Sequence, residues 1–220
     1  MFFLPVSLLL LLIIVLLIPV LLILLPLRIV EAALSRLGIP GPVAFLLFLA
    51  SLLGSLINIP IATRPAPAGP LLFQHHFNLF QPFFWHPGPA TEMTLAINVG
   101  GAVIPLLIVF FLSFRAPGFP TIVASAISTL VCYLVAKPVP GIGITISPFV
   151  PSLVSVGCAF LLSPRKRAPV AYISGVLGVL IGADLLHLFR LPVYSGMMSI
   201  GGAGVFDGIF LVGILAALFA

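Results

Sequence analysis

The sequence predicts an all-α protein, a polytopic bundle of about seven transmembrane helices that forms a single domain over residues 1–220. Hydrophobic residues make up 62% of the chain and charged residues only 6%, against roughly a quarter in a soluble domain. The mean hydropathy is +1.39. The 20 glycines and 22 prolines are too many for straight spans. We therefore expect some helices to be broken, with the freed backbone groups satisfied by neighbouring helices or water-lined cavities.

The amino-terminal residues 1–40 are predicted to form a first span followed by an interfacial helix. Phe2–Leu27 is dominated by Leu, Ile and Val, is long enough to cross a bilayer, and lacks the basic start of a secretory signal. The next segment, Arg28–Leu37, carries Arg28 and Glu31 three residues apart, on one helical face. We expect this short amphipathic helix to lie along the membrane surface.

Six further apolar segments have the length and the flanking charges of membrane spans. They are Gly41–Ala62, Thr94–Phe114, Phe119–Ala136, Ile146–Ser163, Ala171–Phe189 and Gly204–Ala220. Lys137–Pro151 contains four prolines and cannot form a regular helix. The sequence leaves open whether it is a re-entrant or a broken segment. Residues 63–93 contain six prolines and six Phe or Trp residues, so we expect an extramembrane aromatic and proline-rich loop that folds back on the membrane surface.

The basic residues of the short loops predict the orientation. When the spans are numbered in order, one side of the membrane receives six basic residues and the other side three. The first group is Arg28, Arg36, Arg115, Arg165, Lys166 and Arg167, and the second is Arg64, Lys137 and Arg190. We therefore expect a multi-pass protein of the cell membrane with its amino terminus outside and its carboxyl terminus in the cytoplasm. The basic residues form no continuous face, so nucleic acid is not an expected partner.

Two pairs of short segments suggest an internal repeat of two halves. Leu53–Asn58 resembles Leu177–Gly182, and Asn98–Ala102 resembles Ser199–Ala203, in the same order along the chain. Motifs of this length also arise by chance in a leucine-rich chain, so the sequence leaves the repeat open. If the repeat is real, the two halves are parallel copies around a shared centre.

Two carboxylates inside predicted spans are the strongest indication of a functional site. Asp184 lies near the outer end of the sixth span, and Asp207 lies about one turn into the seventh. An ionisable residue in a span costs several kcal/mol and therefore marks function. Asn58 and Asn98 are predicted at the same depth in the outer leaflet, and His187 one turn from Asp184. We predict that these five residues bind a small solute or a cation.

Structural roles for the same residues stay open. The two asparagines can be hydrogen-bond partners between helices. Asp207 can cap the amino terminus of the seventh helix. Asp184 can form a structural pair with His187 or with Arg190.

The sequence predicts no metal site and no cofactor. Three histidines of the loop, His75, His76 and His86, lack the spacing that is typical of a zinc site. Gly100-Gly101 and Gly201–Gly204 follow no predicted strand, so their context excludes a dinucleotide fingerprint. The expected partners are the lipid bilayer and a small solute or cation that the sequence does not identify. An oligomer is possible.

Five longer segments carry a resemblance to a known family. They are Gly54–Pro60, Asn98–Pro105, Ile146–Pro151, Ala171–Asp184 and Ser199–Phe210. These segments resemble an uncharacterised family of archaeal and bacterial integral membrane proteins, catalogued as domain of unknown function 1614. The similarity runs from about Gly54 to the carboxyl terminus, apart from the loop. It implies a polytopic membrane fold and no particular activity.

Two shorter motifs are similar to presenilin-type intramembrane aspartyl proteases, which carry a Tyr-Asp and a Gly-x-Gly-Asp sequence. Phe206-Asp207 is similar to the first and Gly182-Ala-Asp184 to the second, in reversed order along the chain. This resemblance implies a hydrolase in which the two aspartates share a proton and activate water. The first functional hypothesis is therefore a transporter or a solute- or cation-binding membrane component, and the alternative is an aspartyl hydrolase that uses Asp184 and Asp207.

Overall fold

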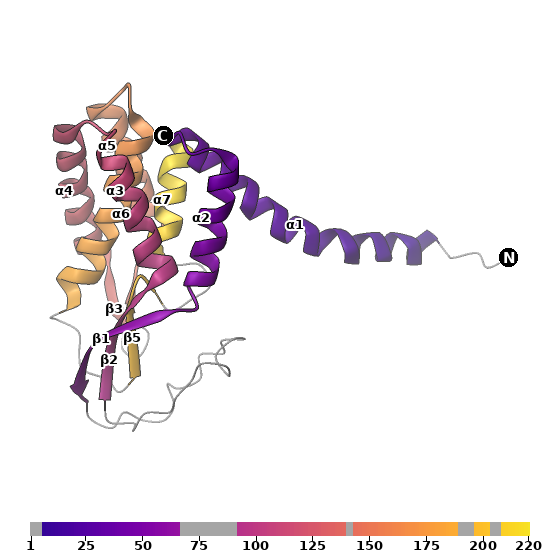
Figure 1. The fold of residues 1–220 in the computed structure, drawn as a ribbon, viewed down its shortest axis with the longest axis horizontal. Helices are drawn as coiled ribbons and strands as arrows, with labels where there is room; N and C mark the ends of the chain where they lie inside the picture. Colours follow the sequence, from indigo (N-terminus) through magenta and orange to yellow (C-terminus); the bar gives the residue numbers. More distant parts are fainter. Residues whose placement is uncertain (1–5, 67–91, 140–142, 189–195, 203–207) are drawn as a thin grey trace.

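The structure, a computed structural model, describes residues 6–66, 92–139, 143–188, 196–202 and 208–220. These residues form a bundle of apolar helices with small β-structures at one end (Figure 1). The helices are α1 (Val6–Arg36), α2 (Gly41–Gly54), α3 (Ile104–Ser113), α4 (Gly118–Val135), α5 (Phe149–Leu162), α6 (Arg167–Leu177) and α7 (Gly208–Phe219). Two π-helical segments, η3 (Val99–Val103) and η4 (Gly178–Leu185), adjoin α3 and α6. The strands are β1 (Asn58–Pro65), β2 (Glu92–Asn98), β3 (Lys137–Val139), β4 (Gly143–Thr145) and β5 (Gly196–Ile200).

Three helical segments are long and apolar enough to cross a membrane, namely Ile13–Arg36, Gly118–Val135 and Arg167–Leu185. Four shorter apolar segments accompany them: Gly41–Gly54, Val99–Ser113, Phe149–Leu162 and Gly208–Phe219. From α2 to α7, each helix runs opposite to the one before it (Figure 1). The prediction of a mainly helical fold with helices able to cross a membrane is confirmed. Within the described ranges, however, only three segments reach full spanning length.

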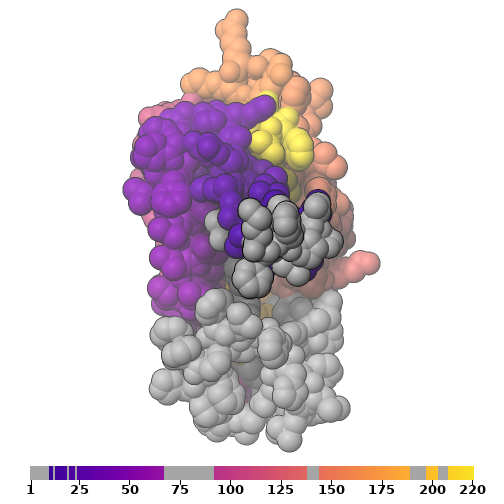
Figure 2. Space-filling view, turned by 90° about the vertical axis from the view of Figure 1, so that its right-hand side faces the viewer, coloured from indigo at the N-terminus to yellow at the C-terminus, as the bar shows by residue number. Residues whose placement is uncertain are grey.

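The prediction of a separate interfacial helix at Arg28–Leu37 is wrong, because α1 continues without a break to Arg36. This segment contains no glycine or proline that would interrupt the helical hydrogen bonds. Ala33 and Leu34 are fully buried where α1 packs against α2 and α7. The amino-terminal part of α1 instead extends away from the bundle (Figure 1), and most of its described side chains are exposed. In Figure 2 the yellow atoms of α7 are visible beside the indigo and purple atoms of α1 and α2.

A three-stranded sheet at one end of the bundle corrects the all-α prediction. The second predicted span leaves the helix after Gly54 and continues as β1, and the third begins as β2. β1 pairs antiparallel with β2, with Asn58 opposite Asn98, and β5 pairs parallel with β2. Pro60 and Pro65 would each remove a hydrogen bond from a helix interior. Both are tolerated in β1 because it lies at the edge of the sheet.

The proline-rich segment Lys137–Pro151 begins as a short hairpin. β3 and β4 pair antiparallel, with Lys137 opposite Thr145, and α5 begins only at Phe149. The prediction that this segment is not a regular helix is confirmed. Residues 140–142 and most of the predicted loop 63–93 lie outside the described residues.

The sheet also contradicts the expectation that no strand precedes the two glycine pairs, which was the reason for excluding a dinucleotide-binding motif. β2 directly precedes the turn with Gly100-Gly101, and β5 precedes Gly201-Gly202. Strands are therefore present before both glycine pairs. What still separates these pairs from the fingerprint is their spacing, because neither continues as G-x-G-x-x-G.

α2 and the π-helical turn η3 cross in backbone contact. Gly54 and Gly100 face each other, and a Cβ atom on Gly54 would lie 3.0 Å from the backbone nitrogen of Gly100. The Ser51 hydroxyl donates a hydrogen bond to the Gly100 carbonyl oxygen over 2.8 Å. A side chain at either glycine would force the two backbones apart. The junction between the bundle and the sheet therefore depends on this glycine pair.

We predict that Gly100→Ala lowers the free energy of unfolding by about 2–3 kcal/mol, or prevents folding, because its Cβ would overlap the backbone of Ser51 and Ser55. Gly157→Ala is the matched control, since no atom of another segment lies within 4 Å of a Cβ at this position in α5. Alanine also exceeds glycine in helix propensity by about 1 kcal/mol. Thermal unfolding in detergent should give a lower midpoint for the first variant and an equal or higher one for the second. A wild-type midpoint for Gly100→Ala would contradict the crossing.

Candidate functional site

A cavity of about 290 Å³ lies where the end of η4 meets β5 and the β3–β4 hairpin. The polar side chains that line it are those of Asp184, Ser199 and Thr145, and Met197 and Met198 contribute to its apolar lining. The three polar residues come from three elements, η4, β5 and β4, of which β4 is the most distant in the sequence. The cavity lies at the sheet end of the bundle, the lower end in Figure 1.

Asp184 lies in a π-helical segment rather than in the predicted α-helix. A π-helix closes each hydrogen bond over five residues instead of four and occurs frequently at functional sites. The segment packs closely against α4, and a Cβ on Gly182 would lie 2.9 Å from that of Cys132. Because the wider turn changes which residues share a face, the predicted alignment of Asp184 with His187 three residues later does not apply here.

The carboxylate of Asp184 is partly buried and has one hydrogen-bond donor within the described part of the chain. The backbone N–H of Gly201 donates to its Oδ2 over 3.1 Å. Gly201 and Gly202 have φ values of 87° and 81°, in the left-handed region that glycine adopts without strain. This turn at the end of β5 aims the N–H at the carboxylate. Among the described residues the only ion pair is Arg28–Glu31, so no described basic side chain neutralises Asp184.

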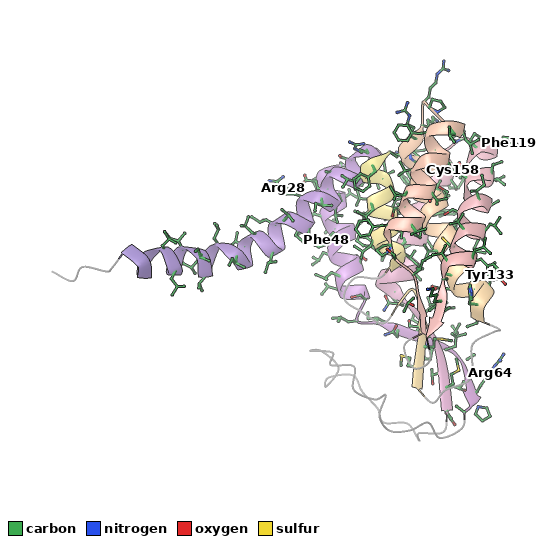
Figure 3. The ribbon with its side chains drawn as sticks, turned by 180° about the vertical axis from the view of Figure 1, so that it is seen from behind. Arg28, Phe48, Arg64, Phe119, Tyr133 and Cys158 are labelled. Carbon is green, nitrogen blue, oxygen red and sulfur yellow. The ribbon has the colours of Figure 1, made fainter. Side chains whose placement is uncertain are left out.

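His187 is buried and forms no hydrogen bond or ion pair with Asp184, so the structural pair of these two residues that the sequence left open is not formed here. Its Nδ1 lies 3.1 Å from the Gly182 carbonyl oxygen and 3.0 Å from that of Ala183. Carbonyl oxygens only accept hydrogen bonds, so these two contacts require a proton on Nδ1. The imidazole also packs on the Tyr133 ring, with 4.9 Å between the ring centroids. Figure 3 labels Tyr133 at the sheet end of α4.

Asn58 and Asn98 lie on paired strands and not on helices, and the structure brings their side chains together. The Nδ2 of Asn98 donates to the Ser55 carbonyl oxygen over 2.8 Å and to the Asn58 Oδ1 over 3.1 Å. Its Oδ1 accepts a hydrogen bond from the Gly101 backbone N–H over 2.7 Å. Asn98 is fully buried, and both its oxygen and its amide group are engaged with the protein.

Ser199 and Thr145 are cavity residues that the sequence did not single out for binding. The Ser199 hydroxyl donates to Asn58 Oδ1 over 2.6 Å, and the Thr145 hydroxyl donates to the Lys137 carbonyl oxygen over 3.2 Å. Each hydroxyl proton is therefore directed at a protein acceptor, and the oxygen lone pairs remain for another partner. The one available signal was the similarity between the segments that begin at Asn98 and Ser199, which did not specify a role for the serine.

Several predicted residues lie outside the described part of the chain. They are Asp207, Arg190 and the loop histidines His75, His76 and His86. The pairing of Asp184 with Arg190 and the distance between the two aspartates therefore stay predictions. Gly208, which follows Asp207 in the sequence, lines the cavity together with Ile209. Within the described ranges, no group of three or more His, Cys, Asp or Glu residues could hold a metal ion.

Comparison with known proteins supports one of the two resemblances. A family described as a protein of unknown function (DUF1614) matches residues 52–219. No curated protein and no solved structure matches the chain, and the likeness to presenilin-type proteases rests on the two short motifs alone. The family match includes α3 to α7, all five strands and every residue of the candidate site. Since it covers well over half of the sequence, the chain belongs to the DUF1614 family of proteins of unknown function.

Proposed function

We propose that the protein binds a small cation, or a solute with a small cationic group, at Asp184, as a transporter or a cation-binding component of the membrane. The observation that carries this proposal is the partly buried Asp184 carboxylate, which lines a cavity and has no basic partner among the described residues. A carboxylate in an apolar bundle is costly unless a positive charge accompanies it. A bound cation would supply that charge.

The oxygen atoms around the cavity support a cation rather than an anion. Ser199 and Thr145 direct their hydroxyl protons at other protein groups, so their lone pairs can face the ligand. One Asp184 oxygen accepts the Gly201 N–H, which leaves the other oxygen without a described partner. Carboxylate and neutral oxygen ligands suit alkali and alkaline-earth cations. The cavity of about 290 Å³ is large compared with the ~30 Å³ that one water molecule occupies, so a hydrated ion or a small organic ammonium would fit.

The membrane setting of this proposal keeps the predicted topology. In it, the seven apolar helical segments are the spans, and the sheet end faces outside. Arg64 and Lys137 belong to the sheet end, whereas the larger basic group belongs to the opposite, cytoplasmic end. Asn58 and Asn98 would orient the site through Ser199, and Asp207 would complete the proposed set. His187 lies nearby on η4 carbonyl oxygens and Tyr133 without lining the cavity, so a role for it would be indirect. The two-half repeat remains part of the proposal, supported by the parallel pairing of β2 with β5.

An intramembrane aspartyl hydrolase is the second candidate. Gly208, the residue after Asp207 in the chain, lines the same cavity as Asp184. Hydrolysis would require the two carboxyl groups to share a proton, so that one activates water while the other protonates the scissile carbonyl. Cleavage of a transmembrane peptide that is lost in both Asp184→Asn and Asp207→Asn would favour this candidate over the cation site.

We predict that a small cation stabilises the wild-type protein and not Asp184→Asn. The measurement is thermal unfolding in detergent at fixed ionic strength, with sodium, potassium or ammonium chloride replacing the salt of a bulky organic cation. A ligand at about a hundred times its Kd adds roughly 2.7 kcal/mol. Without a cation, Asp184→Asn should equal or exceed the wild-type midpoint, because it removes a buried charge.

The matched control is Glu92→Gln, which removes an exposed carboxylate from β2 and should keep the wild-type response. If Asp184→Asn responds to cations as the wild type does, the assignment of the cation site to Asp184 is wrong. A large loss of stability in Asp184→Asn without cations would assign the carboxylate to the scaffold.

The topology makes a separate prediction. Single cysteines replacing Arg64 and Arg165, both exposed and near opposite ends of the molecule, should label from opposite sides of the membrane with an impermeant maleimide. The background carries Cys132→Ala and Cys158→Ala, which remove the native thiols. In intact cells we expect labelling at position 64 alone. Labelling at position 165 alone would invert the proposed orientation, and labelling at both would contradict a spanning bundle.

A further inference from the structure

Three connections between helices meet at the end of the bundle opposite the sheet. Lys166, between α5 and α6, donates a hydrogen bond from Nζ to the carbonyl oxygen of Arg115, between α3 and α4, over 2.6 Å. The guanidinium of Arg115 lies beside Gly38, in the turn between α1 and α2. Its Nη1 is 3.6 Å from the position of a Cβ on that glycine. These contacts join the three connections into one surface, at the upper end in Figure 1.

This surface, called here the basic end, carries five positive charges that no described carboxylate neutralises. The residues are Arg36, Arg115, Arg165, Lys166 and Arg167. All are exposed except Arg167, which is half-buried. Of the described acidic residues, Glu31 pairs with Arg28 over 3.1 Å. Glu92 in β2 and Asp184 beside β5 belong to the other end of the molecule. The positive potential of the basic end is therefore open to a partner.

Two of these arginines lie over phenylalanine rings, within the distance of a cation–π contact. The guanidinium carbon of Arg115 is 4.4 Å from the centroid of Phe111, and that of Arg167 is 4.3 Å from the centroid of Phe160. Phe114, directly before Arg115, is 75% exposed. Exposed aromatic rings beside long cationic side chains are typical of the depth at which acyl chains meet lipid headgroups. The basic end thus combines phenylalanine rings on the sides of the helices with a rim of cationic side chains, called here the cationic rim, that includes Arg115 and Arg167.

Arg167 supplies a hydrogen-bond donor that has no acceptor in the described part of the chain. Its Nε is buried, and no described residue accepts a hydrogen bond from it. A buried N–H of this kind is rare without a partner, and the guanidinium group suits phosphate oxygens because it can donate two parallel hydrogen bonds. Arg167 also begins α6, whose N-cap residue Lys166 provides no side-chain cap.

We infer that the basic end binds the phosphate group of an anionic phospholipid. Arg115, Lys166 and Arg167 surround the headgroup, and the acyl chains lie along the exposed phenylalanines of α3 and α5. A lipid fits better than a soluble phosphate compound, because the stacked rings of Phe111 and Phe160 continue the cationic rim onto the apolar sides of these helices. An anionic headgroup fits better than a zwitterionic one, because uncompensated cations repel a choline group.

The test uses the full-length protein in neutral detergent with added phosphatidylglycerol or phosphatidylcholine. Lipid retention is measured by native mass spectrometry and stability by thermal unfolding. We expect phosphatidylglycerol to be retained and to raise the midpoint, and phosphatidylcholine to do neither. Arg115→Gln and Arg167→Gln should each weaken retention by about tenfold, roughly the effect of one lost charge-assisted contact. Arg64→Gln, which removes an exposed charge from the sheet end, is the matched control and should retain the lipid as the wild type does.

Equal retention of the two lipids, or wild-type retention in both arginine variants, would overturn the inference. So would a rise of the midpoint with inorganic phosphate alone that equals the rise with phosphatidylglycerol, because it would assign the site to a soluble ligand. If Arg167→Gln does not fold, Arg165→Gln removes an exposed charge of the same surface and takes its place. Asp184→Asn should bind phosphatidylglycerol as the wild type does. The lipid site and the cation site are therefore tested independently of each other.

Discussion

The buried side chain of Asn98 is the interaction on which the sheet end of the molecule depends. Its amide bonds to the end of α2 through the Ser55 carbonyl, to β1 through Asn58 and to η3 through the Gly101 N–H. Asn58 extends the connection to Ser199 on β5. Hydrogen bonds are stronger in apolar surroundings than in water, and a lost partner leaves a buried polar group unsatisfied. The position of β5, and with it one wall of the cavity beside Asp184, therefore rests on an amide that does not line the cavity.

The described polar chemistry is concentrated at two ends of an apolar bundle, and the two ends differ in kind. The sheet end carries oxygen atoms and the Asp184 carboxylate, which forms no ion pair with a described basic side chain, whereas the basic end carries cations that form no ion pair with a described carboxylate. Between them the helices approach through small residues, as is common in membranes. Gly178 of η4 lies against Ser128 of α4, which forms a hydrogen bond with Ser155 of α5. This close packing holds the π-helical segment that carries Asp184.

Much of the helical part of the fold could be predicted from the sequence, because apolar runs bounded by charge or proline are local signals. The predicted span Phe119–Ala136 and the observed α4, Gly118–Val135, differ by one residue at each end. The strands could not be predicted in the same way. By composition, Asn58–Pro65 and Glu92–Asn98 are apolar enough to continue a helix. Their pairing joins residues 27 to 40 positions apart, from Pro65–Glu92 to Asn58–Asn98. The alignment of Asp184 with His187 failed for a related reason, since the π-helical turn reflects packing against α4.

The sequence by itself determined that the chain forms helices apolar enough to cross a membrane, its family, the unequal distribution of basic residues and the presence of a carboxylate in an apolar segment. All of these follow from composition, short motifs or a single residue in its local run. Only the tertiary structure decided which oxygen atoms surround Asp184. It also decided that the Ser199 and Thr145 hydroxyls donate their hydrogen bonds to other protein groups. Ser199 meets Asn58 across 141 positions of the chain, and Asp184 meets the turn after β5 across 17. Hydrogen bonds depend on the distance and direction between two particular atoms, and no local pattern of residues encodes either quantity.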